Sequence, residues 1–152
     1  MIRVYIETSA LGFYYDDRAP RERDAVRALL RRIQRKELEG FTSRVTQAEL
    51  EAAPSLLAEK LLSLVKTYAL EAVPSTAEAE DLAEAYLAAG IIPRTHRADA
   101  VHVAIAVIQK ANVIATYNLK HMANYRAVTL VNNLNRERGL PSIDIRTPEQ
   151  LL

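Results

Sequence analysis

The stretch ADAVHVAIAVIQKANVIAT, residues 98–116, decides the fold class of this chain. Between Ala98 and Ile108, apolar side chains occupy every side of a helix, so this helix should be central and buried all round. Asn112 breaks the helix, and Val113–Thr116 is a short apolar run typical of a strand inside a sheet. A buried helix that leads directly into a buried strand predicts an α/β domain.

Strand-like and helix-like segments alternate on both sides of this stretch. Further strands are expected at Ile2–Ile6, Phe41–Arg44, Leu70–Val73 and Ile143–Ile145. Helices are expected from Pro20 to about Lys36, from Thr46, from Ser55 to about Thr67, from Ser75 to near Gly90, and from Leu119 to Arg138. The alternation predicts a single domain, residues 1–152, with three α/β/α layers around a mostly parallel sheet of four to five strands.

Composition narrows the functional classes. The chain has 152 residues, 49% hydrophobic and 26% charged, which are ordinary values for one globular domain. It contains no cysteine, which excludes disulfides and thiolate metal sites. The formal net charge of +1 gives no argument for nucleic acid. No apolar run reaches the ~20 residues of a membrane span, and Met1–Glu7 reads as a strand and not as a signal peptide. We therefore expect a cytoplasmic protein with no membrane contact.

Oxygen-bearing side chains follow or precede the expected strands. In a parallel sheet, right-handed crossovers place the carboxyl ends of the strands at one edge, where ligands bind. Four side chains can converge there from separate segments: Glu7, Glu49, Asp99 and Asn118. All are hard ligands, which suits Mg²⁺ or Mn²⁺. Three histidines without a three-ligand cluster in the sequence make a zinc site an unfavoured alternative.

Each of these residues also has a simpler structural interpretation. Glu49 has capping-box spacing from Thr46, and Asp99 can interact with a helix dipole. Asn118 can be the N-cap of the helix expected after it. The functional interpretation is favoured because all of these residues would share one edge of the sheet.

Four segments of the chain resemble motifs of PIN domains. Val4–Ala10 resembles the opening strand of the family, with an acid followed by Thr or Ser and then Ser. Thr46–Leu50 resembles the second acidic motif, and Arg97–Ala106 is similar to the Asp-Ala-x-His-x-Ala-x-Ala helix. Thr116–Asn118 stands where the family often has Thr-x-Asp. The resemblance covers nearly the whole chain and is closest to a VapC-like subgroup, the toxins of type II toxin–antitoxin pairs, which includes an Asn-x-x-His segment.

The resemblance implies a metal-dependent endoribonuclease that hydrolyses phosphodiester bonds in single-stranded RNA. It assigns Mg²⁺ or Mn²⁺ to Glu7, Glu49 and Asp99, with Asn118 as a fourth catalytic residue that orients a ligand or water. It further implies a single-stranded or structured RNA substrate, a cognate antitoxin and a homodimer. The supporting residues form two groups: Thr8, Ser9, Thr116 and His102 around the carboxylates, and Arg94, His96 and Arg97 as candidates for holding the RNA backbone.

Two positions depart from the family pattern. The first acid is Glu7 instead of Asp, and Asn118 replaces the fourth acid and brings no charge. A rival interpretation is therefore a catalytically weakened PIN module that binds RNA or a protein partner without cleaving. A nucleotide-binding or phosphatase domain has no support, because the chain has only four glycines and no phosphate-cradling glycine loop.

Overall fold

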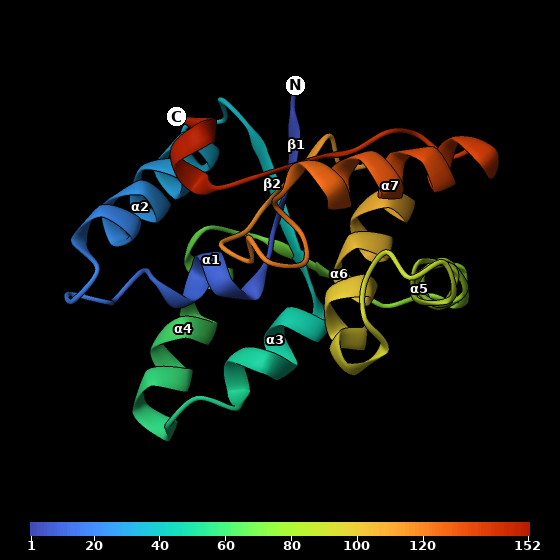
Figure 1. The fold of residues 1–152 in the computed structure, drawn as a ribbon. Coiled ribbons are helices and arrows are strands. Elements are labelled where there is room, and N and C mark those ends of the chain that lie inside the picture. Colours follow the sequence, from blue (N-terminus) through green and yellow to red (C-terminus); the bar gives the residue numbers. More distant parts are fainter.

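Five strands form one parallel sheet in the order β3-β2-β1-β4-β5 (Figure 1). The computed structural model describes all 152 residues. The strands are β1 (Arg3–Ile6), β2 (Glu39–Ser43), β3 (Glu71–Val73), β4 (Val113–Ala115) and β5 (Asp144–Arg146). Every neighbouring pair runs parallel. The predicted α/β class and central sheet are confirmed, and the sheet is entirely parallel.

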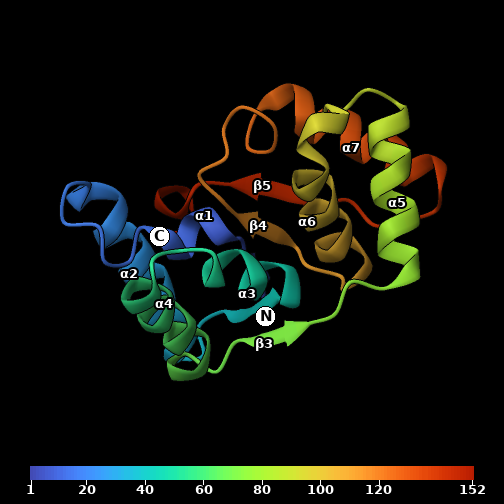
Figure 2. The same cartoon turned by 90° about the horizontal axis from the view of Figure 1, so that it is seen from below.

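Helices cover both faces of this sheet (Figures 1 and 2). Side chains of β1 alternate between the two resulting cores, because successive residues of a strand point to opposite faces. Val4 and Ile6 belong to one core, and Tyr5 belongs to the other. The first core is covered by α1 (Thr8–Gly12), α2 (Pro20–Gln34) and α4 (Ser55–Thr67), and the second by α5 (Ala77–Ala88), α6 (Arg97–Ile108) and α7 (Tyr125–Glu137).

The remaining helical elements lie at the edges of this three-layer structure. Helix α3 (Arg44–Glu51) follows β2 directly and contacts α1 and α4, below the carboxyl ends of the strands in Figure 1. The short 3₁₀ turn η1 (Arg94–His96) precedes α6. A second 3₁₀ turn, η2 (Pro148–Leu151), is the last element of the chain. None of the helices is both long and apolar enough to cross a membrane.

Helix α6 is buried as its sequence predicts. All residues from Ala100 to Val107 are buried, and they pack between α5 and the sheet. His102 is the one polar side chain in this run, and it is completely inaccessible to solvent. A buried histidine must find hydrogen-bond partners, so its surroundings point to the site described below.

The starts of α3 and α5 differ from the sequence prediction. Helix α3 begins two residues before Thr46, because the Ser43 hydroxyl accepts a hydrogen bond from the Thr46 amide and caps it. The capping-box interpretation of Glu49 is therefore wrong. Thr76 caps α5 through the Ala79 amide. The short helix α1, directly after β1, was not predicted at all.

The helix expected from residue 119 begins only at Tyr125. Its N-cap is Asn124, whose side chain accepts a hydrogen bond from the Ala127 amide at 2.8 Å. Asn118 is therefore not the cap of α7. Its side-chain oxygen accepts a hydrogen bond from the His121 amide at 3.0 Å, which stabilises a separate turn. Residues 119–124 therefore form a loop between Asn118 and the start of α7, where the sequence predicted the first turns of a helix.

Gly40 in β2 allows α2 to approach the sheet closely. A Cβ atom built on Gly40 would lie 2.5 Å from Cδ1 and 2.9 Å from Cγ2 of Ile33. We expect Gly40→Ala to lower the free energy of unfolding by about 1–3 kcal/mol, because overpacking forces the neighbouring side chain out of its position. Urea denaturation measures this loss. The matched control is Gly12→Ala, where nothing lies within 4 Å of the new Cβ; equal stability of the two variants would contradict the prediction.

Candidate metal centre

The site lies where the order of the strands reverses. From β1 the chain adds β2 and β3 on one side of the sheet and then β4 and β5 on the other. Ligands of open parallel sheets bind in the crevice outside the carboxyl ends of the strands at such a switch point. Glu7 directly follows β1 and Thr116 directly follows β4, so both residues stand at this crevice.

Glu7 is a nearly buried carboxylate with one oxygen fixed and the other free. Its Oε2 accepts hydrogen bonds from the Ser9 amide (3.0 Å), the Ser9 hydroxyl (2.5 Å) and the Thr116 hydroxyl (2.8 Å). Its Oε1 accepts no hydrogen bond. Every buried side-chain oxygen or nitrogen in the structure has a hydrogen-bond partner, so Oε1 cannot be buried. Oε1 therefore reaches solvent and is available to a ligand.

Glu49 extends from α3 toward the same crevice. Its Oε1 accepts hydrogen bonds from the Thr8 hydroxyl at 2.7 Å and from Nε2 of His102 at 2.5 Å. Burial on its own would raise the pKa of Glu49, but the bonds to His102 and Thr8 lower it below the ordinary value of a glutamate. Glu49 is therefore held in its charged form, and its Oε2 has no hydrogen-bond partner.

His102 connects the two acids to the buried core. Its Nε2 contacts Glu49 and lies 3.9 Å from Oε1 of Glu7, while its Nδ1 lies 2.7 Å from the Tyr5 hydroxyl. Burial lowers the pKa of His102, but the negative charges of Glu49, Glu7 and Asp99 outweigh burial and raise the pKa above its ordinary value. A protonated His102 would place a positive charge against Glu49 and 3.9 Å from Glu7.

Tyr5 is a member of the site that the sequence did not reveal. Its hydroxyl lies 2.8 Å from the Ser43 hydroxyl as well as against His102, so it links β1, β2 and α6. Burial raises the pKa of Tyr5 far above the ordinary value, which keeps the hydroxyl protonated. The available signal was a hydroxyl-bearing side chain in the middle of a strand that is buried on both faces, where such a group requires a partner.

Replacement of His102 by alanine should be costly to stability. The substitution removes a fully buried ring and leaves the Tyr5 hydroxyl without one of its partners. We expect His102→Ala to lower the free energy of unfolding by about 2–5 kcal/mol, measured by thermal or urea denaturation. The control is His96→Ala at an exposed position of the same segment, expected within about 0.5 kcal/mol of wild type. Equal losses in both variants would contradict this account of the His102 network.

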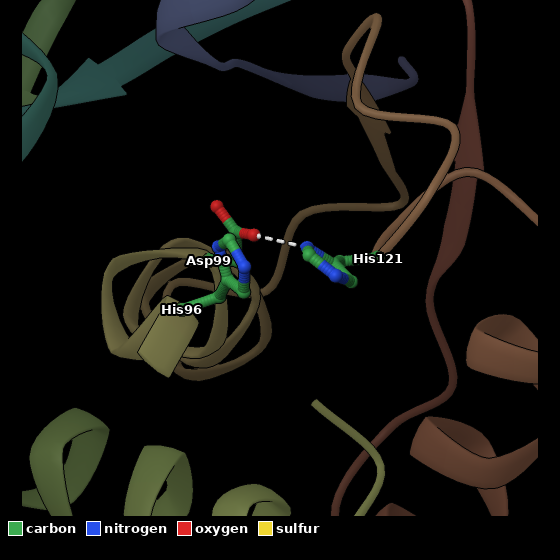
Figure 3. Close-up of side chains that lie close together, drawn as sticks. All are labelled: His96, Asp99 and His121. Atoms are coloured by element: carbon green, nitrogen blue, oxygen red, sulfur yellow. Dashed lines mark hydrogen bonds and ion pairs between the residues drawn. The ribbon is translucent and has the colours of Figure 1, made fainter. Parts of the chain in front are cut away.

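Asp99 has a different partner from the two glutamates. Its Oδ2 lies 3.0 Å from Nδ1 of His121 (Figure 3). The group whose ligand atoms all lie within 4.8 Å of one another consists of Glu7, Glu49 and His102 and does not include Asp99. Oδ1 of Asp99 accepts no hydrogen bond. The structure thus brings two of the predicted acids together, whereas the third is paired with His121 and acts on the site only through its charge near His102.

Asn118 does not present its side-chain oxygen to the glutamates. That oxygen accepts a hydrogen bond from the His121 backbone amide, and the backbone amide of Asn118 donates one to the Thr116 hydroxyl at 3.0 Å. Thr116 in turn donates to Glu7. The observed role of Asn118 is therefore to hold the loop that carries His121 and to connect it to the Glu7 network.

The basic residues before α6 already have partners within the chain. Arg94 forms an ion pair with Glu84 at 2.7 Å, and Arg97 forms one with Glu80. The His96 ring lies over that of His121, with a centroid distance of 4.1 Å. Binding of RNA by these residues stays a prediction. The sequence shows no three-ligand cluster with histidine, but in the structure His96, Asp99 and His121 meet, although the first and last are 25 positions apart.

The free oxygens at this edge fit a hard divalent cation. Glu7, Glu49 and Asp99 each keep one carboxylate oxygen without a hydrogen-bond partner, while hydroxyl or imidazole groups fix the other oxygen. Mg²⁺ and Mn²⁺ prefer sites with few carboxylates and with room for water and phosphate ligands. Fixed second oxygens also match the rule that metal ligands are themselves held by hydrogen bonds.

Comparisons with known proteins identify the family. The PIN domain profile matches residues 4–127, and the chain belongs to the PIN-domain family. PIN-domain nucleases are metal-dependent hydrolases, and this chain has a cluster of acidic groups that could hold a metal ion. The fold is similar to that of a chain in the VapBC2 complex of Rickettsia felis bound to a DNA fragment from its promoter. The TM-score is 0.58 at 12% identity, covering 96% of this chain and 98% of that one. No curated protein sequence matches the chain.

Proposed function

We propose that this chain is a Mg²⁺- or Mn²⁺-dependent endoribonuclease that hydrolyses phosphodiester bonds in single-stranded RNA. Glu7, Glu49 and Asp99 would hold the cation directly or through water. The observation that carries the proposal is the pair of glutamates at the switch point, each with one oxygen fixed by hydrogen bonds and one oxygen free. The match to the PIN domain supports the class of chemistry.

The chain's own residues prepare this centre in three ways. The hydroxyls of Ser9, Thr116 and Thr8 fix the two glutamates, so little reorganisation is needed when a substrate arrives. His102 lies 2.5 Å from Glu49 and 3.9 Å from Glu7, and its hydrogen bond lowers the pKa of Glu49. A bound divalent ion would supply Lewis-acid stabilisation of the attacked phosphate and a water of lowered pKa.

A cleavage assay tests the proposal. The full-length chain is incubated with a fluorescently labelled pool of single-stranded RNA in Mn²⁺, in Mg²⁺ and in EDTA. The proposal expects cleavage with either ion, none with EDTA, and none of a DNA pool of the same sequences at equal enzyme concentration. Binding of RNA without metal-stimulated cleavage would overturn it in favour of the weakened binding module.

Asn118→Asp reports whether this residue lies close enough to sense the cation. An aspartate keeps the oxygen that accepts the His121 amide hydrogen bond and adds a negative charge. We expect Mn²⁺ affinity, measured by isothermal titration calorimetry, to rise about tenfold, which corresponds to about 1.4 kcal/mol. The matched control is Asn112→Asp at the opposite edge of the sheet, where no change is expected. An unchanged affinity of Asn118→Asp would show that Asn118 acts only on the loop.

We further propose that the chain functions as the toxin of a toxin–antitoxin pair. The likeness of its fold to a chain of the VapBC2 complex supports an antitoxin partner. A homodimer is a related proposal. Leu56 and Leu57 of α4 are exposed and could contribute to a dimer interface, whereas Leu61 and Leu64 are buried in the core and could not. Co-expression with the neighbouring gene, followed by size-exclusion chromatography with light scattering, tests both proposals. A monomer that captures no partner would contradict them.

A further inference from the structure

His96, Asp99 and His121 form a cluster that the proposed nuclease centre does not use in full. We propose that these three residues form a second metal site, specific for a transition-metal cation such as Zn²⁺. His96 ends the turn η1, Asp99 lies in the first turn of α6, and His121 comes from the loop that follows β4 (Figure 3). This site does not depend on RNA cleavage, because it requires only the three side chains.

The ligand atoms of the cluster are spaced almost as they would be around a bound metal ion. One ligand atom from each residue lies within 4.8 Å of the other two, and the Asp99 and His121 atoms are 3.0 Å apart. Ligand atoms that each lie about 2.0–2.2 Å from one metal ion are separated by roughly 3–3.5 Å. Asp99 and His121 already satisfy this spacing. His96 is exposed and can close the remaining gap by a rotation of its side chain.

The backbone supports this convergence from both sides. His96 is the N-cap residue of α6 and Asp99 lies in its first turn, so both side chains stand at the same end of this helix. The hydrogen bond from the His121 amide to the Asn118 side chain fixes the position of His121 on its loop. The two imidazole rings lie with centroids 4.1 Å apart. Asp99 and His121 are already held by their mutual hydrogen bond, so these two side chains lose little entropy when they bind an ion.

The ligand types distinguish this site from the glutamate pair. Imidazole favours Zn²⁺ and other first-row transition metals, whereas carboxylate and water favour Mg²⁺. Two histidines and one carboxylate also leave coordination positions open for water or substrate, as in catalytic and not in structural zinc sites. Asp99 borders both groups of ligands. The molecule therefore presents a hard-ligand centre and an imidazole-rich site side by side.

Zinc binding by the intact chain, without RNA, tests this proposal. Competition with a chromophoric zinc chelator should give one equivalent of Zn²⁺ for the wild type. His96→Gln and His121→Gln should each weaken binding at least about tenfold, since loss of residues that merely orient a ligand already costs 10–100-fold. Glu7→Gln and Glu49→Gln should bind Zn²⁺ within about twofold of wild type. Thermal melting of each variant confirms that it is folded.

Two results would overturn the proposal. One is the absence of stoichiometric Zn²⁺ in the wild-type protein. The other is loss of binding in Glu49→Gln with retention in both histidine variants, which would place Zn²⁺ at Glu7, Glu49 and His102 instead. Absorption of bound Co²⁺ in the visible region gives a second readout, because its bands should change in the histidine variants. A failure of RNA cleavage would leave all of these measurements unaffected.

Discussion

Glu49→Gln is expected to remove nearly all metal-stimulated cleavage of RNA. Glutamine has the same size as glutamate and can still accept the Thr8 hydrogen bond, but it lacks the negative charge that would hold the cation. Metal ions contribute several kcal/mol to the stabilisation of such transition states, so the expected loss in kcat/KM is about 10²–10⁴-fold. Initial rates with labelled RNA in Mn²⁺ measure it.

Glu51→Gln is the matched control for this variant. Glu51 lies at the end of the same helix, α3, and is exposed, so its replacement should leave the rate within about twofold of wild type. Equal rates of Glu49→Gln and wild type would indicate a contaminating nuclease or a different active site. Either result would remove the glutamate pair from the proposed mechanism.

Asp99→Asn has the second-largest expected effect on cleavage, and it addresses the residue on which sequence and structure differ most. The proposed centre requires the Asp99 charge although its observed partner is His121. We expect Asp99→Asn to reduce Mn²⁺-dependent cleavage by about 10²-fold or more while the melting temperature stays nearly unchanged, because its side chain is only half-buried.

The control for Asp99→Asn is Asp81→Asn on the exposed face of α5, which should cleave like wild type. If Asp99→Asn also keeps full cleavage while Glu49→Gln is inactive, Asp99 belongs to the histidine cluster alone. The nuclease centre would then consist of Glu7, Glu49 and their hydrogen-bond partners. That outcome would correct the ligand set without changing the assigned edge of the sheet.

Local patterns were sufficient to predict the sheet and the edge where the acids gather. The uniformly apolar α6, the strand at Val113 and the acid directly after β1 follow from periodicity and from the polarity of parallel sheets. These rules depend on residues that are close in sequence. They also placed Glu49 on the helix after β2, although they assigned the start of that helix to the wrong residue.

Contacts between distant residues could not be predicted in the same way. His102 meets Glu49 across 53 positions, and His121 meets Asp99 across 22 positions. Their encounter depends on how α6, α3 and the loop after β4 pack in three dimensions, and no periodic pattern encodes that packing. The loop itself was missed because Asn118 and Asn124 are both good N-cap residues, and only the tertiary structure selects Asn124 for α7.

The central claim is that a divalent ion binds at the carboxyl edge of β1 and β2, between Glu7 and Glu49. Paramagnetic broadening of amide signals by substoichiometric Mn²⁺ in ¹⁵N-labelled protein tests it most directly. The account predicts that the amides of Ser9 and Glu49 broaden first, while those of Lys36 and Lys110, at the opposite edge of the sheet, stay sharp. Broadening that begins at His121 and spares Ser9 and Glu49, or no selective broadening at all, would contradict it.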